Sequence, residues 1–286
     1  MTRLYISVDI EGICGVVTPA QCAPTADAKA YHQAVDQMAL EVNTVVEAAL
    51  SCGVSSVLVN DSHLSMANLR LQHLAPHLSD KITLLSGKPK PTAMAAGLTQ
   101  DFDVAMHIGY HAKAGTLNAV LCHTFQQQVC DMSINGVSYG EGGVNALYAS
   151  MMHQVPVILG SGDDAYCREM AAFCPDIQTV CTKYALGFAA AQNRPWPEVK
   201  SDYETTVKRA LEAHQNGDIQ RPIVEPPYAL VMTLSNSLYG DTLGMIPGWE
   251  RLDGVRLCYK ADDFYTLYMA LQSGYSILSY ANTILK

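Results

Sequence analysis

Short apolar runs alternate along the chain with longer segments in which apolar residues recur at helical spacing. The runs have the length of buried strands, and they are LYISVDI, SSVLVN, ITLLSG, VAMHIG and VPVILGS. The segment after the first run predicts a helix that stops near Gly53, with apolar positions at Val35, Met38, Val42, Val45 and Ala49. Because parallel strands need crossover connections, this order predicts an α/β fold, a mostly parallel sheet flanked by helices in three layers.

The later part of the chain shows a different order of elements. Asn135-Gly136 lies between two short β-type runs and predicts a hairpin. Helical patterns cover residues 142–154, 163–174 and 195–217. Three prolines in residues 218–227 indicate a linker, and a further strand and helix follow it. We therefore predict a main α/β domain over residues 1–217, a linker over 218–227 and a small α+β domain over 228–286.

Composition describes a well-packed globular protein. Of the 286 residues, 49% are apolar and 16% are charged. The net charge of −9, without a cluster of Lys or Arg, argues against binding to nucleic acid or to an anionic membrane. No apolar segment is long enough to span a bilayer, and Asp9 and Glu11 interrupt any signal-peptide pattern. We expect a cytoplasmic protein.

The cysteines fit the same compartment. There are nine, an odd number, and no two are spaced as C-x-x-C. This pattern favours reduced thiols over a disulfide framework or a thiolate zinc site. Cys122 stands beside His123, which raises the alternative of a cysteine nucleophile. Adjacent residues of a strand face opposite sides, so this alternative is disfavoured.

The first apolar run ends in two carboxylates, Asp9 and Glu11. Residues two apart on a strand share one face, so two like charges would lie close together. Either the strand ends here and both carboxylates are solvated, or a cation lies between them.

Further metal-binding residue types follow other predicted strands. His63 follows SSVLVN, His111 follows VAMHIGY, and Glu141 follows the predicted hairpin at the start of a helix. Ligands of open α/β sheets bind at the carboxyl ends of the strands, where these side chains would meet Asp9 and Glu11. A catalytic zinc takes three protein ligands, so five suggest two metals about 3.5–4 Å apart, bridged by a carboxylate. Asp9 is the natural bridge if its strand is central.

The residues also carry a family resemblance. The strings SVDIEG, VNDSH, GYHA, LCHTF and GEGGVNA, in this order and at these separations, resemble the M55 peptidases, the D-aminopeptidases of bacterial dipeptide operons. The resemblance implies that Asp9, Glu11, His63, His111 and Glu141 bind two zinc ions. It implies that His123 is catalytic, although its run NAVLCHTF by itself reads as a strand with a core histidine. It further implies a ring-shaped homo-oligomer, a decamer.

The function that follows is that of a zinc-dependent aminopeptidase with two Zn²⁺ per subunit. It would release N-terminal D-amino acids, such as D-Ala, from short peptides. His123 would act as general base and acid or as nucleophile. Two alternatives stay open: a dinuclear metallohydrolase of another amide or ester bond, and a non-catalytic dipeptide-binding ring protein. No H-E-x-x-H motif or Walker loop is present.

Overall fold

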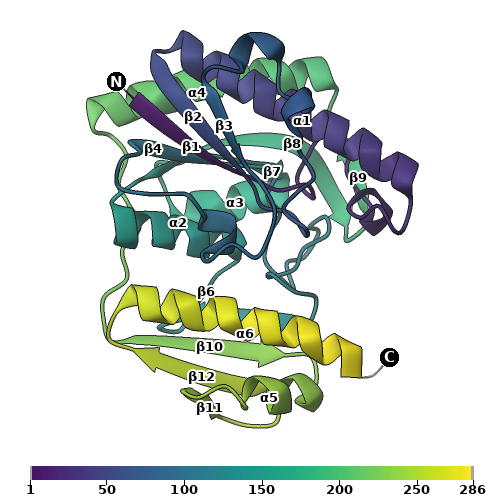
Figure 1. Ribbon diagram of the computed structural model, residues 1–286, viewed down its shortest axis with the longest axis vertical. Helices are drawn as coiled ribbons and strands as arrows, with labels where there is room; N and C mark the ends of the chain where they lie inside the picture. The colour runs from purple at the N-terminus through teal and green to yellow at the C-terminus, as the bar shows by residue number, and fades with distance from the viewer. Residues whose placement is uncertain (1, 285–286) are drawn as a thin grey trace.

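A computed structural model describes residues 2–284 and shows two sheets, one above the other in Figure 1. The larger sheet has seven strands in the order β3-β2-β1-β4-β7-β8-β9, and the first six run parallel. Only β9 pairs antiparallel, at the edge. The strands are β1 Thr2–Val8, β2 Val54–Asp61, β3 Ile82–Leu85, β4 Val104–Ile108, β7 Val157–Asp163, β8 Gln178–Gly187 and β9 Ala190–Asn193. The predicted mostly parallel α/β sheet is confirmed.

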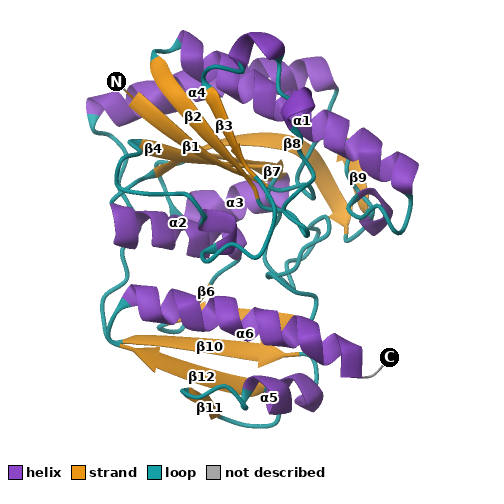
Figure 2. Ribbon diagram, in the orientation of Figure 1, coloured by secondary structure: helices purple, strands orange, loops and turns teal. Residues whose placement is uncertain are grey.

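Helices cover both faces of the larger sheet, which makes the predicted three layers (Figure 2). The long helices α1 (Ala28–Ser51) and α4 (Trp196–Asn216) pack together on one face, and α2 (Glu141–His153) and α3 (Asp164–Phe173) cover the other. The apolar positions predicted for the first helix are buried against the strands. The Asp27 side chain caps α1 by accepting hydrogen bonds from two backbone N–H groups of its first turn.

The smaller sheet is antiparallel, with the strand order β11-β12-β10-β5-β6. The Asn135-Gly136 turn joins β5 to β6 with both residues at positive φ, which confirms the predicted hairpin. The elements of this unit are β5 Val129–Ile134, β6 Val137–Ser138, β10 Tyr228–Leu234, α5 Ser237–Leu243, β11 Trp249–Arg251, β12 Arg256–Ala261 and α6 Phe264–Ile284. Since β5 pairs with β10, this sheet takes a hairpin from before residue 218. The domain division at 218–227 stays a prediction.

Helix α6 joins the two units. It lies over the smaller sheet and faces the loops below the larger one (Figure 1). Tyr268 donates a hydrogen bond of 3.0 Å to Asn145 in α2, and the ring of Tyr275 stacks on Phe125 with centroids 5.0 Å apart. Helix α6, at the C-terminal end of the chain, therefore forms one wall of the region between the two sheets.

The segment around His123 differs from the sequence prediction. Residues 118–125 form turns rather than a strand, with positive φ at Asn118, Leu121 and Phe125. Val120 and Leu121 are buried all the same. The prediction was wrong because a short apolar run shows burial and not conformation.

Four short 3-10 helices complete the described part of the chain: η1 Pro19–Gln21, η2 Leu71–His73, η3 Pro76–Leu78 and η4 Ala93–Ala95. Among residues 2–284, no helix combines the length and the apolar character needed to cross a bilayer.

Candidate metal centre

Six side chains singled out from the sequence converge beyond the carboxyl ends of β1, β2 and β4. Asp9 directly follows β1, while His63 and His111 lie just beyond β2 and β4. Because β1 lies between β2 and β4, these three ends are neighbours. Glu141 opens α2, and His123 comes from the loop between β4 and β5. The structure thus brings together residues that are up to half the chain apart in sequence.

The two carboxylate oxygens of Asp9 face two different histidines. Oδ1 lies 3.0 Å from Nδ1 of His63, and Oδ2 lies 3.6 Å from Nε2 of His111. Glu11 completes the first group, 3.1 Å from His63, and Glu141 completes the second, 3.4 Å from His111. Within each group the three donor atoms lie within 4.8 Å of one another, close enough to share one metal ion.

Burial excludes the alternative in which Asp9 and Glu11 are both exposed to solvent. The exposed fractions of Asp9, Glu11 and Glu141 are 2, 6 and 4%. Burial, together with the charge of Glu11, raises the pKa of Asp9 to about 7. Burial alone would lower the pKa of His63, but the carboxylates beside it raise that pKa well above its usual range. Three carboxylates gathered in this way stay ionised at little cost only beside positive charge.

Backbone carbonyls orient the three histidine rings. His63 Nε2 lies 2.7 Å from the carbonyl oxygen of Cys22, and Nδ1 of His111 lies 3.0 Å from that of Ala112. A carbonyl only accepts, so the ring nitrogen facing it carries a proton, and the other nitrogen faces the cluster, where it can coordinate a metal ion once deprotonated. His111 Nε2 is one of the buried atoms that have no hydrogen-bond partner within residues 2–284, and Glu11 Oε2 faces Nδ1 of His63 at 3.1 Å. Lone pairs of buried nitrogen and oxygen atoms aimed at one point fit a metal such as zinc.

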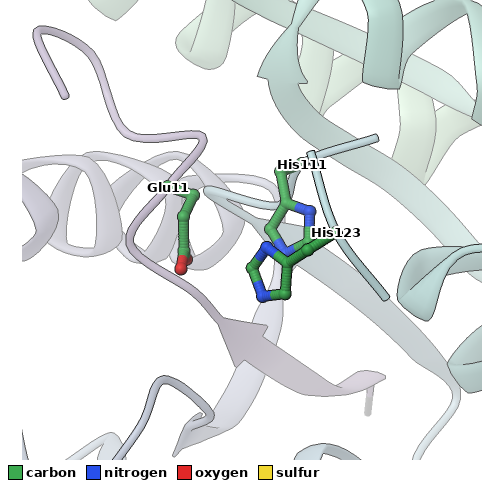
Figure 3. Close-up of side chains that lie close together, drawn as sticks. All are labelled: Glu11, His111 and His123. Atoms are coloured by element: carbon green, nitrogen blue, oxygen red, sulfur yellow. The ribbon is translucent and has the colours of Figure 1, made fainter. Parts of the chain in front are cut away.

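His123 lies at the open side of the cluster. Its ring stacks on His111 with centroids 4.1 Å apart, and Glu11 faces both rings (Figure 3). Nδ1 of His123 lies 2.8 Å from the carbonyl oxygen of Leu121, and Nε2 lies 3.6 Å from Oε1 of Glu141. Burial and the neighbouring charge of His111 lower the pKa of His123, which favours a neutral ring that accepts a proton. Glu11, His111 and His123 also form a third group with metal-binding spacing.

Two glycines let the loop after β1 press against the loop after β4. A Cβ on Gly12 would lie 2.0 Å from the carbonyl oxygen of Tyr110, and Gly109 adopts φ +70. The N–H of Gly12 donates a hydrogen bond of 2.8 Å to the carbonyl of Gly109. Side chains here would push the carboxylates away from His111.

A buried lysine that the sequence analysis missed holds the loop carrying Glu11. Lys183 in β8 is fully buried, and its Nζ donates hydrogen bonds of 2.7, 2.8 and 2.6 Å to the carbonyl oxygens of Glu11, Ile13 and Val16. Burial lowers the pKa of this lysine to about 8. Its sequence signal is a single cation inside the otherwise uncharged strand QTVCTKYALG.

Lys183→Met is expected to lower the free energy of unfolding by about 3 kcal/mol, because buried carbonyl groups lose their donor. Metal affinity should fall as well, since the backbone of Glu11 loosens. Urea unfolding with and without metal measures both effects. The control Lys200→Met removes a lysine from the exposed face of α4 and should stay within about 0.5 kcal/mol of wild type. An unchanged unfolding curve for Lys183→Met would refute the bracing role.

Asp163 positions the His123 loop, and sequence reasoning missed it too. Its Oδ2 accepts a hydrogen bond of 2.7 Å from the N–H of Val120, while Oδ1 caps α3 through the N–H of Tyr166. One carboxylate therefore ties the His123 loop to the sheet.

Two rival nucleophiles lie outside this arrangement. Gly136 to Gly140 spell G-x-S-x-G, but Ser138 lies in β6, where its hydroxyl donates to Asp131 and accepts from Lys113. No histidine base contacts this serine among the described residues, as a nucleophile elbow would require. Burial raises the pKa of Cys122, whose thiol faces the carbonyl of Thr116. A protonated thiol is a poor nucleophile.

Comparisons with known proteins agree with one another. Residues 2–273 match the sequence model of the Peptidase_M55 family, described as D-aminopeptidase. A D-aminopeptidase of Bacillus subtilis (strain 168) is 32% identical over 272 residues, covering 94% of this chain and 95% of the relative. The solved structure of the Zn-dependent D-aminopeptidase DppA from Bacillus subtilis, a self-compartmentalizing protease, superposes with a TM-score of 0.88 at 30% identity. That match covers 96% of this chain and 97% of the other.

Proposed function

The chain belongs to the M55 family of D-aminopeptidases and is a D-stereospecific metallo-aminopeptidase, and from this premise we propose that it works through a dinuclear zinc site. Its substrates in this proposal are short peptides with an N-terminal D-amino acid such as D-Ala. One observation carries the dinuclear assignment: Asp9 directs its two oxygens to two separate donor groups. A carboxylate has lone pairs on two oxygens and could bridge two metals in that way, whereas a neutral imidazole has a single lone pair and could not.

In this proposal Asp9, Glu11 and His63 would hold one zinc ion, and Asp9, His111 and Glu141 would hold the other. When bound, the two ions supply an activated water nucleophile and a Lewis acid for the peptide carbonyl. A free α-amino group of the substrate, bound at the cluster, would confine cleavage to the first peptide bond. His123 accepts a proton at Nε2 and returns it to the leaving amine. Its Nδ1–H donates a hydrogen bond to the carbonyl oxygen of Leu121, which leaves Nε2 free to accept the proton.

The size of the cavity supports selection of a small N-terminal residue. A cavity of about 130 Å³ adjoins the cluster, and its apolar wall includes Met66, Met94 and Phe125. With amine and carbonyl held in place, inverting the α-carbon turns the side chain toward a different wall. Closely packed walls do not yield to that change, so one enantiomer is rejected.

We extend the proposal to assembly and location. DppA is described as self-compartmentalizing, and we propose a ring-shaped homo-oligomer, a decamer, for this chain. An apolar groove of about 550 Å³ beside the exposed Leu117 and Val137 is the kind of surface that subunits cover. The nine free thiols support a cytoplasmic location.

Metal analysis combined with a stereospecific assay tests the function. We expect two zinc ions per chain and hydrolysis of D-aminoacyl peptides without cleavage of the matched L-peptides. Light scattering on the same preparation measures the mass of the assembly. One metal per chain would contradict the dinuclear site, and equal cleavage of both enantiomers would contradict the proposed wall.

A further inference from the structure

The cavity beside the metal cluster continues into two larger cavities. Their volumes are about 130, 420 and 530 Å³, running from the cluster to helix α6. Lys88 and Gln126 line all three cavities, so the three form one cleft. In the part of the chain that the structure describes, Lys88 is the single lysine or arginine that lines the two inner cavities.

Two lysines in the segment GKPKP have different surroundings. Lys90 donates hydrogen bonds of 2.6 Å to Oδ1 of Asn60 and 2.7 Å to the carbonyl of Asp61, which ties the segment to the end of β2. The N–H of Gly87 donates to the carbonyl of Met66 on the other side. Lys88, between these two anchors, is exposed to the cleft, and no hydrogen bond or ion pair joins its ammonium group to residues 2–284.

The cleft carries different groups along its length. Its inner end carries Asp9, Glu11 and Glu141, the proposed zinc ligands, and its lining continues past the cluster to the unpaired ammonium of Lys88. In an aminopeptidase the N-terminus of the substrate lies at the catalytic centre, so a short peptide runs from the cluster into the cleft. The carboxylate at its other end is the group that an unpaired ammonium attracts.

We propose that Lys88 binds the C-terminal carboxylate of the peptide substrate, so that the enzyme selects peptides whose free carboxyl group lies close to the scissile bond. This inference rests on the proposed aminopeptidase function and adds a specificity-determining residue to it. The lysine ammonium group is a compact positive charge with three hydrogen-bond donors, and it can bind the carboxylate of a peptide that enters the cleft from solution. The anchored segment holds the lysine at the cleft without occupying its donors.

The expected effect lies in substrate binding. The carboxylate keeps its charge throughout the reaction, so a charge-assisted hydrogen bond to it acts about equally on ground state and transition state, and KM changes while kcat does not. Because Lys88 is exposed, water and salt screen the interaction, and we expect about a tenfold preference in kcat/KM. The preference should shrink as ionic strength rises.

The test compares D-Ala-D-Ala with its C-terminal amide, using the full-length zinc-loaded protein. Wild type should prefer the free acid about tenfold. Lys88→Met should abolish that preference by raising KM for the acid, with hydrolysis of the amide unchanged, and Lys88→Arg should largely restore it. The control Lys81→Met removes the same charge from the exposed turn before β3, where Lys81 lies 3.5 Å from Asp80. This control should keep the preference.

The outcomes separate this inference from the function on which it rests. If wild type cleaves acid and amide equally, or if Lys88→Met lowers both rates by the same factor, the role of Lys88 is refuted while the aminopeptidase function stands. If wild type cleaves neither D-peptide, the proposed function fails and the inference fails with it.

Discussion

Asp9→Ala is expected to remove both metal ions and to lower hydrolysis of a D-aminoacyl peptide by about 10³-fold or more. The bound metals are worth several kcal/mol of transition-state stabilisation, and each 1.36 kcal/mol is a factor of ten. Asp9 is the residue whose two oxygens reach both donor groups, at 3.0 Å from His63 and 3.6 Å from His111. Its loss leaves two ligands in each group, too few for a tight site.

His63→Ala and His111→Ala are the matched comparisons. Each histidine contacts one of the two groups around Asp9, so each variant should chiefly weaken one ion. Elemental analysis of the three purified variants gives the metal count directly. Melting of the metal-free proteins checks the fold, and Asp9→Ala should not be less stable than metal-free wild type, because it removes a like charge beside Glu11. Two ions retained in Asp9→Ala would refute the bridging assignment.

His123→Ala is expected to keep the fold and both metals while kcat falls by about 10²–10⁴-fold, the range for lost acid–base catalysis. KM should change little, because the missing interaction belongs mainly to the transition state. The structural reason is its position at the open side of the cluster, stacked on His111 and oriented by the carbonyl of Leu121. Metal content, melting temperature and kcat, measured on the one variant, test the assignment.

His153→Ala provides the control for His123→Ala. His153 ends α2, where its ring packs edge-on against Tyr148 with centroids 5.5 Å apart, and it lines none of the cavities at the cluster. This variant should show a small loss of stability with normal kcat. If His123→Ala instead loses one metal, His123 is a ligand through its group with Glu11 and His111. An unimpaired kcat would remove it from the mechanism.

Sequence patterns determined the fold class, the hairpin and five of the six side chains that meet at the cluster, whereas His123 was expected there only from the family resemblance. The spacing of apolar residues is a local property of the sequence. It identified strands such as β2 and helices such as α1, because the residues that an element buries recur at the spacing of that element. Asn135-Gly136 identified its turn because few residues tolerate positive φ. The cluster could be predicted because parallel strands place their carboxyl ends at one edge of the sheet, while the position of β1 between β2 and β4 came from the structure.

Tertiary structure alone decided how those side chains are held. Lys183 braces a loop from which it is separated by about 170 residues, and Asp163 ties down the His123 loop across 43 residues. Such bonds run to backbone carbonyl and N–H groups, which all residue types except proline carry, so the sequence of the partner segment does not indicate them. The sequence did not predict the turns at residues 118–125 or the pairing of β5 with β10, for a related reason. Local apolar runs report that a segment is buried, whereas its conformation and its partner depend on contacts between distant parts of the chain.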